Sequence, residues 1–144
     1  MLRSVALLVV LALGCGFARA SDKLEATLYW GRNSNPSLLA RVASPDLSDR
    51  LQAVFGFKHY ELMKADKIDL TKTEPQWFKP RKDLSICFKP RKTVEGEPQL
   101  IDYEIYQEGF LLATGKYEPS DATPLFIGGP DFKNGQLLFV LEAR

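Results

Sequence analysis

The chain has 144 residues, with 19 basic and 18 acidic side chains, one histidine and two cysteines. A formal net charge of +1 gives no overall attraction to polyanions, so we expect neither nucleic acid nor an anionic membrane as a partner. So few cysteine and histidine residues exclude a disulfide scaffold and the usual zinc sites, which need several converging ligands.

The first twenty residues have the pattern of a secretory signal peptide. Arg3 precedes an apolar run over residues 5–13, and Ala18 and Ala20 place small side chains at the two positions that a signal peptidase reads. The run is too short for a membrane-spanning helix, which needs about 20 residues. We therefore expect an exported protein, periplasmic or extracellular, whose mature chain is one domain over residues 21–144.

Cys15 offers a second interpretation of the leader, because residues 12–15 resemble a lipidation signal with a small residue before the cysteine. Ala12 stands where such signals usually have leucine, so cleavage after Ala20 is the preferred interpretation. Lipidation at Cys15 would instead anchor the domain to a membrane. After cleavage at Ala20 only Cys87 remains, and no intrachain disulfide can form.

The mature chain is expected to begin with a strand and a helix. Residues 24–30 are rich in β-branched and aromatic types, and the asparagines and proline of residues 31–37 then indicate a loop. A helix should follow Ser44, whose hydroxyl can cap free amides, with Pro45 in its first turn and Gly56 ending it in the left-handed conformation. Its apolar side chains form one stripe at helical spacing: Leu47, Leu51, Val54 and Phe55.

From residue 57 onward the apolar period falls to two, which indicates strands joined by turns. Tight turns are expected at Glu108-Gly109 and Asn134-Gly135, and the run 137–141, apolar on both faces, predicts a central strand. The pattern indicates an α+β fold, with one helix packed on a mainly antiparallel, twisted sheet or small β-sandwich of about seven to nine strands. The later strands are expected at residues 59–64, 67–70, 76–78, 84–89, 99–107, 110–117, 125–127 and 136–142.

Candidates for catalysis are few. Cys87 and His59 could form a nucleophile and its base, but both also suit simple strand packing. Asp102 and Glu104 should share the solvent face of one strand, at a spacing that two carboxylates use in glycoside hydrolysis. Such pairs occur on almost any half-exposed strand. We therefore assign no catalytic or metal-binding residue and expect no cofactor.

A duplicated pentapeptide, Phe-Lys-Pro-Arg-Lys, occupies residues 78–82 and 88–92. Ten extended residues span about 33 Å, so the copies should lie at opposite ends of a sheet unless a turn at residues 81–83 folds them back. Proline and lysine also end strands and protect exposed edges. The basic residues that could contact an anionic partner are Lys79, Arg81, Lys82, Lys89, Arg91 and Lys92.

Charge is unevenly distributed along the mature chain. Residues 21–92 carry 14 basic and 9 acidic side chains, whereas residues 93–144 carry 3 basic and 9 acidic ones. Folding could either separate these charges into two faces or interleave them.

Four segments resemble a known group of proteins: residues 24–31 (LEATLYWG), 51–60 (LQAVFGFKHY), 125–130 (LFIGGP) and 135–138 (GQLL). On these segments the chain resembles small uncharacterised exported proteins of environmental bacteria that carry a signal peptide. The resemblance covers most of the mature chain and implies export. It brings no activity and no site residue with it.

The leading hypothesis is an exported cell-envelope or secreted module, without catalysis, that binds a protein or another macromolecule of the envelope. The alternatives are a small secreted hydrolase with a carboxylate site and an inhibitor of a secreted enzyme. Aromatic residues that could line a sugar or peptide groove, although packing is their commoner use, are Trp30, Trp77 and Phe78.

Overall fold

The computed structural model describes residues 22–92, 94–119 and 123–144. The signal peptide expected over residues 1–20 lies outside the described residues, as do Cys15 and the cleavage site before Ser21. Within the described ranges, no helix is both long and apolar enough to cross a membrane.

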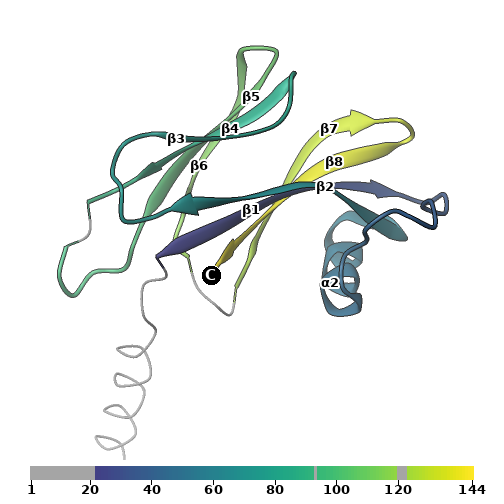
Figure 1. Ribbon diagram of the computed structural model, residues 1–144, viewed down its shortest axis with the longest axis horizontal. Coiled ribbons are helices and arrows are strands. Elements are labelled where there is room, and N and C mark those ends of the chain that lie inside the picture. The colour runs from purple at the N-terminus through teal and green to yellow at the C-terminus, as the bar shows by residue number, and fades with distance from the viewer. Residues whose placement is uncertain (1–21, 93, 120–122) are drawn as a thin grey trace, which may run out of the picture.

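The described chain forms one helix and eight strands in two antiparallel sheets (Figure 1). The first sheet has the order β2-β1-β8-β7 and the second the order β3-β4-β5-β6. The expected α+β class is confirmed. The elements are β1 (Lys23–Arg32), α2 (Pro45–Phe55), β2 (His59–Asp69), β3 (Gln76–Arg81), β4 (Leu84–Pro90), β5 (Ile101–Gln107), β6 (Phe110–Tyr117), β7 (Leu125–Phe132) and β8 (Gly135–Ala143).

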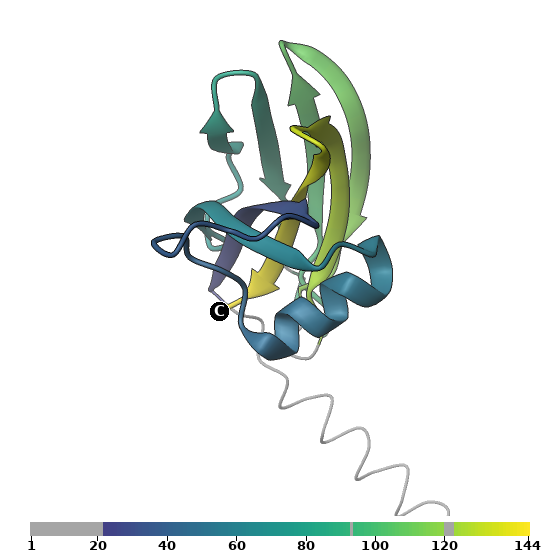
Figure 2. The same ribbon diagram turned by 90° about the vertical axis from the view of Figure 1, so that its right-hand side faces the viewer.

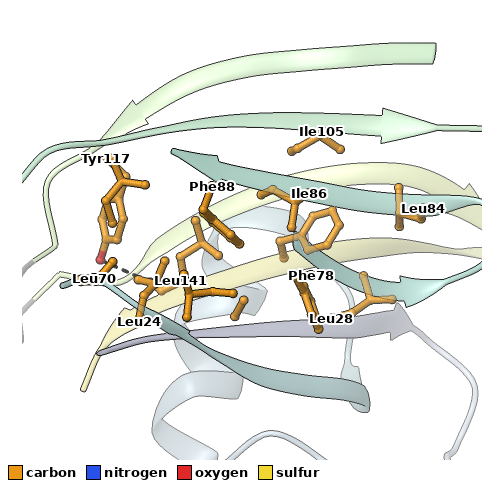
Figure 3. Packing of buried hydrophobic residues seen from close by; sticks show 14 of the residues in the cluster. Leu24, Leu28, Leu70, Phe78, Leu84, Ile86, Phe88, Ile105, Tyr117 and Leu141 are labelled. Carbon is orange, nitrogen blue, oxygen red and sulfur yellow. Dashed lines mark hydrogen bonds between the residues drawn. The ribbon is translucent and has the colours of Figure 1, made fainter. Parts of the chain in front are cut away.

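The two sheets face each other across the main hydrophobic core (Figure 3). Alternate side chains of a strand point to one face, and burial of each large apolar side chain contributes about 1.5–3 kcal/mol to stability. The first sheet and its flanks provide Leu24, Ala26, Leu28, Ile68, Leu70, Leu137, Phe139 and Leu141. The second sheet provides Phe78, Leu84, Ile86, Phe88, Ile101, Ile105 and Tyr117.

The central strand β8 has both faces covered. Its even-numbered residues Leu138 and Val140 point away from the second sheet and pack with Leu51 of α2. Figure 2 shows α2 crossing the first sheet on this outer side. Because β8 lies between β1 and β7, the prediction of a central strand is confirmed.

The helix begins and ends as its sequence predicts. The Ser44 hydroxyl accepts a hydrogen bond from the Leu47 amide at 3.3 Å, and Gly56 takes the left-handed conformation at φ 84°. The predicted apolar stripe is wrong at one position, because Val54 is 60% exposed. Contact with the sheet runs through Leu47, Leu51 and Phe55 at intervals of four residues, which turns Val54 away.

One of the two predicted turns differs in its geometry. Glu108 and Gly109 have positive φ and join β5 to β6, as expected. In the second turn the positive φ values fall on Lys133 and Asn134, whereas Gly135 is already the first residue of β8. The glycine is needed there for another reason, because a Cβ would overlap the backbone of β1.

The strands expected at residues 59–64 and 67–70 are one continuous strand, β2. Ala65 and Asp66, which lie between the two expected strands, pair with Thr27 and Ala26 of β1. A register shift next to Met63 absorbs one extra residue, so alternation breaks while the hydrogen-bonded ladder continues.

Candidate functional site

The most exposed strand is β6, at the edge of the second sheet. Its first five residues, 110–114, are all exposed, and the first three are the large apolar side chains Phe110, Leu111 and Leu112. They are 76, 53 and 50% exposed. Strands normally bury at least one face, so this segment is held mainly by its ladder with β5.

Only the C-terminal end of β6 is anchored in the core. Its last residue, Tyr117, is buried, and the tyrosine hydroxyl lies 3.0 Å from the Thr123 carbonyl oxygen and 3.3 Å from that of Leu141. Figure 3 shows Tyr117 and Leu141 in the core. At the other end, a register shift places Leu112 between the paired residues Leu111 and Ala113. The start of β6 therefore projects beyond the core.

The outer edge of β6 carries no paired strand among the described residues. The backbone N–H and C=O groups along such an edge can accept a further strand, and proteins usually block the edge with charge, proline or a bulge. In β6 the bulge lies at Leu112, and the only charged side chain is Lys116. The apolar first half of the strand has no charge to protect it.

The outer face of the second sheet adjoins β6 and is not covered by another layer of the described chain. On it, the Trp77 and Tyr106 rings pack at a centroid distance of 5.6 Å. Cys87 pairs with Trp77 in the ladder and is only 2% exposed although it points away from the core. Burial raises the pKa of the Cys87 thiol, so the thiol is not an activated nucleophile.

Two ion pairs cross the same face. The Lys89 ammonium lies 2.7 Å from Glu104, and the Arg91 guanidinium donates two hydrogen bonds to Asp102 at 2.8 and 2.9 Å. These bonds lower the pKa of both carboxyl groups. A pair of acids for glycoside hydrolysis needs one member with a raised pKa, so Asp102 and Glu104 do not have the electrostatics of such a pair.

The two basic pentapeptides lie at opposite ends of β4. Phe78 pairs with Ile86 and the first copy continues into the turn, whereas Phe88 pairs with Gln76 and the second copy leaves the other end of the strand. The hairpin turn at residues 82–83 does not bring them together. Pro80 is accommodated by a register shift in the edge strand β3.

The six basic candidates differ in their surroundings. In the first copy, Lys79 lies over the Trp77 ring, while Arg81 contacts Asp83 at 3.2 Å and lies 4.6 Å from the centroid of the Phe132 ring. In the second copy, Lys89 and Arg91 are the partners of the two acids described above. Lys82 and Lys92 are exposed.

The structure does not bring His59 and Cys87 together. His59 begins β2 in the first sheet, and Cys87 lies on the outer face of the second sheet. Within the described ranges, no three histidine, cysteine or acidic residues are grouped so that they could hold a metal ion.

Sequence reasoning predicted β6 correctly as a strand and missed its exposure. The composition of residues 110–113 suggests a buried strand, and only the position of β6 in the sheet reveals the opposite.

Comparisons with models of protein families, with curated proteins and with solved structures found no match.

Proposed function

We propose that the chain is a non-catalytic, exported module that binds a protein of the cell envelope or the secreted medium, and that β6 is its docking strand. The observation that carries the proposal is the run of exposed residues 110–114, three of them large and apolar, on a sheet edge that no other strand of the described residues pairs with. The proposal that the chain is exported is based on the leader sequence in residues 1–20.

Docking would follow the physics of strand addition. An extended segment of the partner pairs with the free edge of β6 through main-chain hydrogen bonds, and its apolar side chains cover Phe110, Leu111 and Leu112. Removing that apolar surface from water contributes about 25 cal/mol per Å². A hollow of about 360 Å³ beside β6 offers room for a partner side chain, and its lining includes Thr114, Lys116, Lys89, Asp102 and Glu104.

A protein partner fits these surroundings better than a polyanion does. Lys89 and Arg91, which stand nearest to β6 among the basic candidates, are bonded to carboxylates of the neighbouring strand. A polyanion would have to compete with Glu104 and Asp102 for them. An inhibitor of a secreted enzyme would use the same docking strand. The identity of the captured partner distinguishes an inhibitor from another binding module.

The test places a photoreactive phenylalanine analogue at position 111 in cells that produce and export the chain. We expect one adduct of discrete mass, whose second component mass spectrometry identifies as one envelope or secreted protein. The matched control position is Leu39, which is 95% exposed on the loop between β1 and α2 and should give no adduct.

Purified components then confirm the complex. Leu111→Lys with Leu112→Lys should weaken binding of the captured protein at least tenfold, whereas Leu38→Lys with Leu39→Lys should leave it unchanged. Both variants change exposed side chains, so their thermal melts should match the parent. His59→Gln with Cys87→Ser should also leave binding intact. Adducts formed equally at position 39, or only between copies of this chain, would contradict the proposal.

A further inference from the structure

A second hollow lies between the first turn of α2 and the outer face of the first sheet. Its volume is about 430 Å³, within the range of about 300–1,000 Å³ typical of small-molecule sites. β1 and β8 form its floor, and Ser44 and Arg50 of the helix region form one wall. Figure 2 shows the helix lying across the ends of these strands.

Two largely buried residues turn a hydroxyl group towards this hollow. Thr27 is 5% exposed and Tyr29 is 9% exposed, and both point to the outer face of β1. Neither hydroxyl has a hydrogen-bond partner within the part of the chain that the structure describes. Both oxygens are accessible from the hollow, since neither is among the fully enclosed polar atoms that lack a partner, so a polar molecule in the hollow can hydrogen-bond to both hydroxyls.

A pair of carboxylates stands beside the hydroxyls. Glu25 and Glu142 are directly opposite each other on β1 and β8, where like charges are unfavourable. Arg144 offsets this repulsion, because its guanidinium lies 3.2 Å from Glu25 and 2.9 Å from Glu142. Each carboxylate keeps free lone pairs that can accept further hydrogen bonds.

The hollow thus presents acceptors, donors and neutral hydroxyls together. Burial, followed by the charges of Glu142 and Glu25, raises the pKa of Tyr29, so its hydroxyl stays protonated near neutral pH. The three carboxylates that line the hollow, those of Glu25, Asp46 and Glu142, disfavour an anionic ligand, and the guanidinium groups of Arg50 and Arg144 offset most of their charge, which weakens the attraction for a cation. Many polar groups and few apolar ones disfavour a hydrophobic ligand.

We propose that this hollow binds a neutral, polyhydroxylated ligand of the size of one or two sugar rings. The hydroxyls of one sugar ring can donate hydrogen bonds to Glu25 and Glu142 and accept hydrogen bonds from Arg50 and Arg144. They can also form hydrogen bonds with the hydroxyls of Thr27 and Tyr29. The lining of this hollow includes no residue of β6, so the sugar-binding proposal can be tested independently of the docking strand.

The test titrates three probes, methyl α-D-glucopyranoside, methyl β-D-galactopyranoside and N-acetylglucosamine, into ¹⁵N-labelled protein. We expect at least one of them to saturate in the millimolar range or below and to shift the amide signals of Thr27, Tyr29 and Glu142. Inorganic phosphate, added under the same conditions, should leave these signals in place.

Two conservative variants separate ligand binding from folding. Tyr29→Phe and Thr27→Val remove one hydroxyl each, keep the shape of the side chain and should weaken sugar binding about tenfold. Because these hydroxyls have no hydrogen-bond partner among the residues that the structure describes, denaturation midpoints without sugar should be unchanged or higher. Tyr106→Phe, on the second sheet, is the matched control and should bind like the parent. No saturation with any of the three sugars, stronger binding of phosphate, or unchanged affinity in both variants would overturn the proposal.

Discussion

Gly135 lies so close to Gly31 that a Cβ on Gly135 would overlap the carbonyl oxygen of Gly31. The same Cβ would stand 2.8 Å from the Trp30 indole nitrogen, which donates a hydrogen bond to the Phe132 carbonyl oxygen. The β7–β8 turn therefore packs directly on the end of β1, and this contact requires glycine.

We expect Gly135→Ala to lower the free energy of unfolding by roughly 1–3 kcal/mol, because backbone atoms must move to make room. Asn134→Gly is the control, since Asn134 has φ 63° and glycine tolerates that conformation. Urea denaturation measures both. Equal midpoints for Gly135→Ala and the parent would mean that the two strands are further apart than described.

Gly56→Ala should lower stability for a purely conformational reason. Gly56 has φ 84°, and a Cβ there would meet no atom within 4 Å. An L-residue in this region costs about 1–2 kcal/mol, so the loss should be smaller than for Gly135→Ala. The comparison of urea midpoints checks the order, and an increase in stability would show that the helix does not end at Gly56 in solution.

Local signals predicted most of the fold. Ser44, Pro45 and Gly56 bound the helix by chemistry that acts within a few residues, and period-two alternation identified strands such as β4 and β6. The extent of β7 was underestimated, because Gly128-Gly129-Pro130 has turn composition. In the edge strand these residues form an irregularity in the register, which no local rule distinguishes from a turn.

The candidate sites depended on long-range pairing and were harder to predict. Glu25 and Glu142 are 117 positions apart and become neighbours only through the register of β1 and β8. Lys89 and Arg91 come from the basic part of the chain and meet acids from the acidic part, so the two charge-biased regions interleave here. The pairing of Glu25 with Glu142 and the interleaving of the two charged regions both depend on strand order, which periodicity in the sequence does not reveal.

Trp77→Ala should expose the thiol of Cys87. The Trp77 ring packs against Tyr106 on the face where Cys87 is buried, and burial raises the pKa of the thiol. We expect labelling by a thiol reagent under native conditions to be slow in the parent and at least tenfold faster in Trp77→Ala. Phe110→Ala, which removes an exposed ring of the same sheet, is the control. Equal labelling rates in all three proteins would show that another group shields the sulfur.

Asp102→Asn should destabilise the protein in a pH-dependent way. The hydrogen bonds from Arg91 lower the pKa of Asp102 below its unfolded value, so their contribution is fully present above that unfolded value and is lost as pH falls through the folded one. The variant should therefore have a lower urea midpoint than the parent near neutral pH, and the two should converge towards about pH 2. If the difference in urea midpoint between Asp102→Asn and the parent persisted unchanged in acid, the destabilisation would come from packing and not from the Arg91–Asp102 hydrogen bonds.

The two basic pentapeptides should act as separate sites of low affinity for polyanions. They leave opposite ends of β4, and Arg91 is already bound to Asp102. Strong binding requires many phosphates or sulfates to be contacted together, so we expect elution from a heparin column at low salt, below about 200 mM. Arg81→Gln and Arg91→Gln should each shift the elution slightly and additively. Retention at several hundred millimolar salt that disappears only in the double variant would instead show one continuous basic surface, and the separation of the two copies along β4 would then be wrong for the protein in solution.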